Sequence, residues 1–179
     1  VFEKPVCGRA SMHINKVASD EELEGLFHMY EDLMIQEFMD GTEYGADVYI
    51  DMISGKVTSL FVKEKIKMRA GETDKSVSVK DEGLFKQIVE FVETAGFKGM
   101  IDIDIFKIGD TYYFSEVNPR FGGGYPHAYE CGVNMPKQVL NNLAGKENTI
   151  TIGDYKEGIV MMKYNEVMIK DMNGMVLVP

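Results

Sequence analysis

Residues 101–120 contain two segments of alternating character, Ile101-Asp102-Ile103-Asp104-Ile105 and Phe114-Ser115-Glu116-Val117-Asn118-Pro119-Arg120. Successive side chains of a β-strand point to opposite faces, so the two aspartates share one face and the isoleucines share the other. Gly109-Asp110 lies between the two segments and indicates a hairpin turn. If the loop closes over residues 109–111, Asp104 lies opposite Glu116 and Asp102 lies opposite Asn118.

This hairpin would gather carboxylate and amide oxygens on one face. Carboxylates that lie directly opposite each other repel unless a positive charge compensates them. A divalent cation would compensate them, and oxygen donors without nearby His or Cys favour Mg²⁺ or Mn²⁺ over zinc. The alternative is a solvated sheet face with alternating polar residues. A two-residue loop would turn Asp104 and Glu116 to opposite faces and would count against a metal site.

The residues after the hairpin extend this pattern toward phosphate chemistry. Arg120 places a permanently charged guanidinium just past the acidic strands, and Gly122-Gly123-Gly124 lets the backbone approach a ligand closely. A metal, an arginine and exposed N–H groups together suit a transferring phosphoryl group. The glycine run alone is more often a flexible turn.

Two segments nearer the N-terminus carry weaker signals. Lys4, at the end of a short strand, precedes the small-residue loop Cys7–Ser11, which could cover phosphate oxygens, although the order of residues is not that of a Walker loop. A strand that leaves its sheet near 37–39 exposes backbone groups that could read adenine, and Glu43 could accept hydrogen bonds from ribose hydroxyls. A surface lysine and a solvated strand exit are the alternatives.

The remaining pattern predicts an α+β fold with a largely antiparallel sheet and helices packed on one side. Ser19 and Glu22 form a capping box before a helix that ends near residue 30. We expect a helix over 81–95 and another over 135–143, because apolar residues recur there at helical spacing. The expected strands are 33–38, the hairpin 44–53 with 56–63, the hairpin 100–108 with 112–117, and two or three short strands after residue 145. The polar stretch 65–80 is expected to be a long mobile loop, and 118–132 a loop rich in glycine and proline.

Composition excludes several classes of protein. The chain has 179 residues, a net charge of −10 and 45% hydrophobic residues, which fits one domain with a buried core, alone or with a small appendage. Its acidity argues against nucleic-acid binding. No apolar run is long enough to span a membrane and no signal peptide is visible, so no membrane partner is expected. Two cysteines without a framework pattern suit a reducing compartment, and we expect a cytoplasmic protein.

The order of these pieces resembles the ATP-grasp superfamily. Lys4-Pro5 comes first, Gln36-Glu37-Phe38-Met39-Asp40-Gly41-Thr42-Glu43 follows, and Asp104 then precedes Glu116-Val117-Asn118-Pro119-Arg120. The chain is most similar to members like the large subunit of carbamoyl-phosphate synthase, and more distantly to D-alanine–D-alanine ligases and biotin carboxylases. The Glu-Val-Asn-Pro-Arg stretch with its upstream acidic strand is specific, whereas the other pieces support the resemblance mainly by order and spacing.

The resemblance implies roles for individual residues. Lys4 would contact ATP phosphates under a flap over Cys7–Ser11 that includes Gly8 and Ser11. The adenine and ribose would be bound by Gln36, Glu37, Phe38, Met39 and Glu43. One or two Mg²⁺ (or Mn²⁺) ions would be ligated by Asp104, Glu116 and Asn118, with Asp102 as an auxiliary ligand. Arg120 would steady the γ-phosphate or an acyl phosphate, and Lys65 and Arg69, on the polar loop Lys63–Ser76, would contact substrate or phosphate.

The resemblance also implies a division of the chain and a reaction. Residues 1–40 would be the remainder of a small nucleotide-binding lobe, 41–145 the large lobe with the metal site, and 146–179 a small C-terminal segment. Relatives carry more chain upstream, so we expect an N-terminally incomplete domain that is inactive alone. The intact protein would use ATP to activate a carboxylate or bicarbonate as an acyl phosphate and join it to an amine, and it could form a homodimer. The alternative is a non-catalytic nucleotide-binding module that acts with a separate chain.

Overall fold

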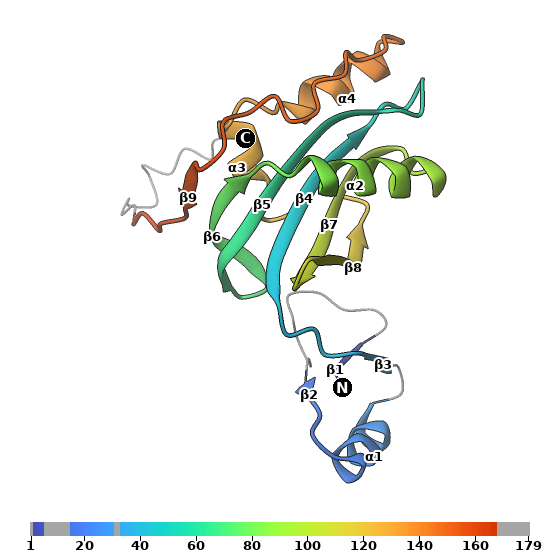
Figure 1. Ribbon diagram of the computed structural model, residues 1–179, viewed down its shortest axis with the longest axis vertical. Helices are drawn as coiled ribbons and strands as arrows, with labels where there is room; N and C mark the ends of the chain where they lie inside the picture. Colours follow the sequence, from blue (N-terminus) through green and yellow to red (C-terminus); the bar gives the residue numbers. More distant parts are fainter. Residues whose placement is uncertain (1, 6–14, 31–32, 168–179) are drawn as a thin grey trace, which may run out of the picture.

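The computed structural model describes residues 2–5, 15–30 and 33–167 and contains two antiparallel sheets (Figure 1). The smaller sheet has the strand order β2-β1-β3, made of β1 (Phe2–Pro5), β2 (Asn15–Lys16) and β3 (Leu33–Gln36). The larger sheet has the order β8-β7-β4-β5-β6-β9. Its strands are β4 (Thr42–Ile50), β5 (Val57–Arg69), β6 (Glu72–Val79), β7 (Gly99–Ile108), β8 (Thr111–Asn118) and β9 (Val160–Met162). The predicted α+β fold with an antiparallel sheet is confirmed.

Within the described residues, four helices accompany the sheets: α1 (Asp20–Met29), α2 (Glu82–Thr94), α3 (Tyr125–Glu130) and α4 (Met135–Leu143). The Ser19 half of the capping box predicted for α1 is present, because the Ser19 hydroxyl accepts from the backbone N–H of Glu22. The Glu22 carboxylate accepts from the N–H of Ala18, one residue before the N-cap. Helix α3 was not expected within the glycine-rich stretch. In the described residues, no helix is long and apolar enough to cross a membrane.

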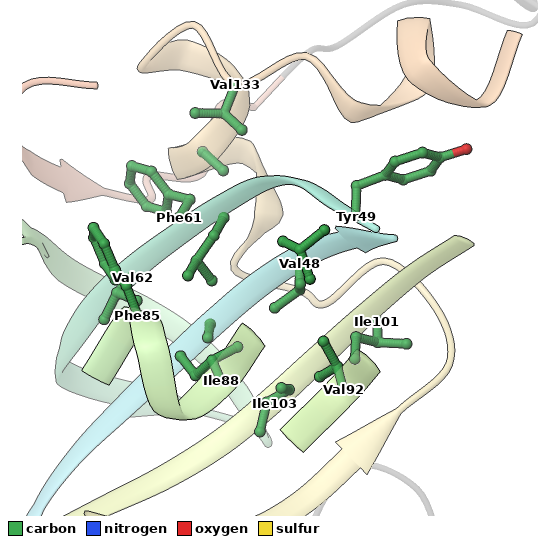
Figure 2. Close-up of a cluster of buried hydrophobic side chains, with 14 of the residues drawn as sticks. Val48, Tyr49, Phe61, Val62, Phe85, Ile88, Val92, Ile101, Ile103 and Val133 are labelled. Atoms are coloured by element: carbon green, nitrogen blue, oxygen red, sulfur yellow. The ribbon is translucent and has the colours of Figure 1, made fainter. Parts of the chain in front are cut away.

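One part of the core lies between α2 and one face of the large sheet, and a second part, which includes Phe61 and Val133, lies on the opposite face (Figure 2). Leu84, Ile88 and Val92 recur every fourth residue on α2 and are fully buried against Ile101 and Ile103 of β7, together with Val48 of β4. Asp81 caps this helix by accepting from the backbone N–H of Leu84. The alternating isoleucines of β7 therefore face the core, and the aspartates between them face away from it, as the sequence predicts.

The stretch that was expected to be a mobile loop is a hairpin, so that prediction is wrong. Residues 57–79 form β5 and β6, joined by a turn in which Ala70 and Gly71 both have positive φ. Apolar and polar residues alternate in both strands, as in Lys65-Ile66-Lys67-Met68-Arg69 and Ser76-Val77-Ser78-Val79, so the sequence carries a strand signal there. The usual burial is inverted, because Ile66 and Met68 are exposed whereas the polar Ser76 and Ser78 are buried.

The opposite face of the sheet is covered at one end by α3 and α4. Tyr49 donates its hydroxyl hydrogen to the Asn142 side chain on α4, and Gln138 of the same helix donates to the Ser59 hydroxyl. His127 of α3 packs edge-on against Phe61. The other end of this face, from β5 to β8, carries charged side chains and is described next.

Candidate functional site

The charged face is the part of the large sheet opposite α2 that carries side chains from four adjacent strands. Its members are Glu43 and Asp47 on β4, Lys63 and Lys65 on β5, Asp102 and Asp104 on β7, and Glu116 and Asn118 on β8. Because neighbouring residues in register share a face, the pairing of these four strands brings all eight side chains to one side.

A bulge in β8 decides the geometry of the acidic hairpin. The loop between β7 and β8 has two residues, with Ile108 opposite Thr111, so the expected closure over 109–111 is wrong. The register then shifts at Ser115, between the pairs Ile105–Phe114 and Asp104–Glu116. The extra residue restores the predicted pairs, because a bulge moves every following side chain to the other face. Asp104 therefore lies opposite Glu116, and Asp102 lies opposite Asn118.

The oxygen donors of Asp104, Glu116 and Asn118 fit a hard divalent cation whose remaining coordination positions are filled by a bound ligand. In the described residues, no three His, Cys, Asp or Glu side chains are grouped closely enough to hold a metal ion. Magnesium in phosphate-transfer sites commonly takes one or two carboxylates and fills its remaining positions with phosphate oxygens and water. Two carboxylates and the neighbouring amide of Asn118 match that donor set better than a site made of protein ligands alone.

Lys65 is the positive charge closest to the acidic hairpin. Its ammonium group lies 2.6 Å from a carboxylate oxygen of Glu43 and 2.6 Å from one of Asp104. Only 4% of the side chain is exposed. Burial alone would lower the pKa of Lys65, but the carboxylates of Asp104 and Glu43 outweigh it and raise the pKa. Lys65 therefore lies on a strand inside the site, where the sequence predicted a loop at its border.

A second lysine pairs with the neighbouring carboxylate. Lys63 donates to Asp47, and both side chains are fully buried. The other oxygen of Asp47 has no hydrogen-bond partner among the described residues. Asp102 lies opposite Asp47 in register. Burial and the charge of Asp47 together raise the pKa of Asp102 to about 6.

Glycines leave room for the long side chains of the charged face, such as Lys63 and Lys65. A Cβ atom on Gly45 would lie 3.2 Å from Cε of both Lys63 and Lys65. The three consecutive glycines each approach a different charged side chain. A Cβ on Gly122 would lie 2.5 Å from the Asp102 carboxylate, one on Gly123 would lie 2.7 Å from Glu72, and one on Gly124 would lie 2.8 Å from Lys63. The glycine run therefore packs its backbone over the charged face, and a side chain at these positions would clash.

The two predicted arginines lie at different places. Arg120 reaches Asp102 at 3.4 Å and is more than half exposed, so it lies at the rim of the charged face. Arg69 lies near the end of β5 and pairs with Asp74 at 3.1 Å. The structure therefore brings Arg120 to the acidic hairpin, whereas Arg69 belongs to the far end of the β5–β6 hairpin.

The predicted nucleotide contacts are only partly described. Lys4 lies on β1 opposite Met34, with its side chain outside the described residues, as are Gly8 and Ser11 of the expected flap. Gln36 ends β3, and Glu37–Met39 continue without regular structure toward β4, so the expected strand exit is present. The ammonium of Lys16 lies 3.9 Å from the ring centre of Phe38. Glu43 is the member of this set that joins the charged face, through Lys65.

Sequence reasoning missed Asp47, Lys63 and Gly45. The signal was present, because Glu43, Gly45 and Asp47 alternate along one strand as Lys63 and Lys65 do along the next. The two lysines fell into the expected loop, so their register with β4 was not considered. His127 of α3 is buried beside Ser76 of β6. It accepts from the Ser76 hydroxyl at one ring nitrogen and donates to the Ile159 carbonyl at the other.

The chain matches the model of one known family. The family described as "ATP-grasp in the biosynthetic pathway with Ter operon" matches residues 29–167. The chain belongs to this ATP-grasp family. The match includes Glu43, Lys65, Asp104, Glu116 and Arg120. A search of curated protein sequences gives no match.

Several solved structures have a similar fold. The biotin carboxylase domain of the Hydrogenobacter thermophilus 2-oxoglutarate carboxylase, solved with MgADP, ADP and bicarbonate, has a TM-score of 0.70 and 14% identity over 89% of this chain and 39% of that one. The Bacillus licheniformis L-amino acid ligase gives 0.57 and 22% over 79% and 38%. The ADP-bound Staphylococcus aureus N5-carboxyaminoimidazole synthetase gives 0.62 and 14% over 81% and 40%. This chain spans less than half of each of these three proteins.

Proposed function

We propose that this chain carries the metal- and phosphate-binding part of an ATP-dependent ligase. The protein would activate a carboxylate or bicarbonate as an acyl phosphate and join it to an amine. The observation that carries the proposal is the β8 bulge, which brings Asp104, Glu116 and Asn118 to one face beside Lys65. The family membership and the ligase fold of the structural relatives support the same reaction class.

In this proposal the oxygen donors bind the metal ion and the cationic side chains stabilise the phosphates. Asp104, Glu116 and Asn118 would hold Mg²⁺ (or Mn²⁺), which supplies charge neutralisation for the phosphates when it is bound. Lys65 would stabilise negative charge on the transferring phosphoryl group, because a fixed cation in a desolvated site acts more strongly than it does in water. Arg120 would add its charge from the rim of the site. The glycine run would exclude water above the buried pair of Lys63 and Asp47.

The nucleotide and the division of the chain belong to the same proposal. Adenine and ribose would be bound by Gln36, Glu37, Phe38, Met39 and Glu43, and the triphosphate by Lys4 with the flap over Gly8 and Ser11. Residues 1–40, 41–145 and 146–179 would be the small-lobe remainder, the large lobe and a C-terminal segment. Arg69 would contact an acceptor at the far end of the β5–β6 hairpin.

The finer identity of the reaction is also part of the proposal. Bicarbonate is named with the Hydrogenobacter thermophilus domain, which forms a dimer in its structure. A bicarbonate-and-amine pair like that of carbamoyl-phosphate synthase, in a cytoplasmic homodimer, is the specific form that we propose to test first. Arg120, at the rim of the charged face, is the side chain best placed to bind such an anion.

Calorimetry with MgADP on this chain tests the binding step. We expect Glu116→Gln to weaken MgADP binding at least tenfold, because it removes one of the two carboxylates opposed across the hairpin. Glu90→Gln on the exposed side of α2 is the matched control and should leave binding unchanged. Equal affinity of the wild type and Glu116→Gln would refute the metal assignment.

The reaction itself is tested on the longest natural polypeptide that contains these residues. Phosphate release from ATP would be followed with bicarbonate and a panel of carboxylates, each with and without an amine. Release that depends on both acceptors supports the ligase, and Glu116→Gln should abolish it. MgADP binding without acceptor-dependent release by that polypeptide would favour the nucleotide-binding module that acts with a separate chain.

A further inference from the structure

Lys65 occupies an unusual position for a residue that serves only as a phosphate contact. Its ammonium bridges Glu43, the proposed ribose ligand, and Asp104, a proposed metal ligand, at 2.6 Å each. The lysine is nearly inaccessible to solvent, whereas Glu43 and Asp104 are 29% and 28% exposed. The positive charge therefore lies beneath two carboxylates that a ligand can still reach from outside.

The stem of Lys65 reaches this position because β4 has no side chain at Gly45. A Cβ there would lie 3.2 Å from Cε of Lys65, so the ammonium can cross to the β7 side of β4 and contact Asp104. Asp104 lies directly opposite Gly45 in register. The combination of a glycine and a bridging lysine places one fixed cation where the carboxylates of β4 and β7 meet.

A fixed cation and a divalent metal ion are competitors at the same oxygens. The affinity of an oxygen site for a hard divalent cation rises with the negative charge of its ligands. Lys65 cancels one of the three negative charges of Glu43, Asp104 and Glu116 and occupies one oxygen of Asp104. A triphosphate would restore the missing negative charge and also offer Lys65 another acceptor.

We propose that Lys65 is a resident counter-ion that competes with a divalent cation for Asp104, and so makes tight metal binding depend on the nucleotide. This inference rests on the proposed function, because it uses Asp104 and Glu116 as metal ligands. It goes further in assigning Lys65 a regulatory task at that site. The metal would bind well only together with phosphates, and free Mg²⁺ would leave the carboxylates paired with the lysine.

Binding of Mn²⁺ without nucleotide, followed by the loss of its free electron paramagnetic resonance signal, tests the competition. We expect Lys65→Met to bind Mn²⁺ at least tenfold more tightly than the wild type. Lys56→Met is the matched control, because it removes the same charge from an exposed pair with Glu93 away from the site. Adding Asp104→Asn to Lys65→Met should abolish the gain. Equal Mn²⁺ affinity of the wild type and Lys65→Met, or no Mn²⁺ binding by either, overturns the proposal.

The same titration with ADP present supplies the second half of the test. The nucleotide should tighten Mn²⁺ binding by the wild type at least tenfold more than it tightens binding by Lys65→Met.

If Lys65→Met does not fold, the wild type gives an independent measurement. Acylation of amines, read by mass spectrometry, should modify Lys65 severalfold faster at saturating Mn²⁺, while Lys56 stays constant. Unchanged Lys65 labelling would contradict the competition.

The two hypotheses fail in different ways. A wild-type chain that does not bind MgADP, but whose Lys65→Met variant binds Mn²⁺ more tightly, would refute the proposed function and leave the competition standing. A chain that binds MgADP well and shows no effect of Lys65→Met on Mn²⁺ would keep the function and refute the role of Lys65.

Discussion

Asp47 and Asp51 lie four residues apart on the same face of the large sheet, both are fully buried, and they are satisfied in opposite ways. Asp47 is paired with the charged group of Lys63, and its second oxygen has no hydrogen-bond partner in the described part of the chain. Asp51 accepts six hydrogen bonds from neutral donors. These come from the backbone of Ile53, Ser54 and Asn148 and from the side chains of Ser54, Asn142 and Asn148.

The difference indicates that Asp51 has a structural role, whereas Asp47 belongs to the candidate functional site. Burial alone would raise the pKa of Asp51, but the hydrogen bonds from Ser54, Asn142 and Asn148 outweigh it and hold the pKa far below its usual range. Every donor to Asp51 is fixed by a turn, by α4 or by the segment after it, so the cluster is complete without a ligand. The charged face instead balances carboxylates with lysines, and such charges can be redistributed when a ligand arrives.

Asp104→Asn is expected to have the largest effect, and it tests the distinction between the charged face and the Asp51 cluster. Removing a proposed metal ligand should lower acceptor-dependent phosphate release by about 10³-fold or more, as loss of electrostatic stabilisation does in other enzymes. Lys65 keeps Glu43 as a partner, so we expect the free energy of unfolding to change by less than about 1 kcal/mol. Phosphate release and urea denaturation measure the two quantities. A variant that loses several kcal/mol of stability but keeps its turnover would reverse the distinction.

Asp51→Asn should show the opposite pattern. The new amide group would face the donors of Asn142 and Asn148, so a buried network would lose its acceptor, at a cost of about 3 kcal/mol. Urea denaturation at neutral pH measures this loss, and MgADP affinity of the folded protein should be unchanged. Because the pKa of Asp51 is lowered by folding, its contribution is complete above a pH of about 4 and is lost on further acidification. A loss of stability under about 1 kcal/mol would show that the network is dispensable.

The sequence predicts the apolar half of this fold well, for a physical reason. Alternating isoleucines in β7 and the spacing of Leu84, Ile88 and Val92 in α2 report burial directly, because only the face toward the core must be apolar. The pairing of Asp104 with Glu116 was also predicted, although from the wrong loop. The two-residue turn and the bulge at Ser115 shift the register twice, and the two shifts cancel.

The rest could not be predicted because it depends on contacts between distant segments. Lys65 and Asp104 are 39 residues apart in the sequence and meet only through the register of three strands. In the β5–β6 hairpin the apolar Ile66 and Met68 are exposed, whereas the buried positions include Thr73, Ser76 and Ser78. Such polar burial is stabilised by specific partners, such as His127 for Ser76, and these partners are not visible in local sequence.

The buried, neutral state of His127 can be tested through the pH dependence of stability. Burial and the charge of Lys63 lower its pKa to about 4, so the folded protein keeps the ring neutral while the unfolded chain binds a proton near pH 6.5. Between these values the unfolded state holds more protons, and stability therefore falls as the pH falls. We expect the wild type to lose about 3 kcal/mol relative to His127→Gln between pH 7 and pH 4. Urea denaturation of both proteins across this range measures the difference, and parallel pH profiles would contradict a buried neutral histidine.

The smallest effect, expected for Gly45→Ala, tests whether the lysines of the charged face are fixed in place. The new methyl group would lie 3.2 Å from Cε of both Lys63 and Lys65, which is closer than ordinary contact. A free lysine would move aside without cost, but these two are held by Asp47 and by Glu43 with Asp104. We therefore expect a loss of about 1 kcal/mol in the free energy of unfolding, within the range for overpacking a filled site.

Gly25→Ala is the control, because nothing lies within 4 Å of that position and alanine favours a helix. It should stabilise the chain by roughly 0.5 kcal/mol. If Gly45→Ala were as stabilising as the control, the lysines would be free to move, and the balance of fixed charges that distinguishes this half of the sheet from the Asp51 cluster would not exist.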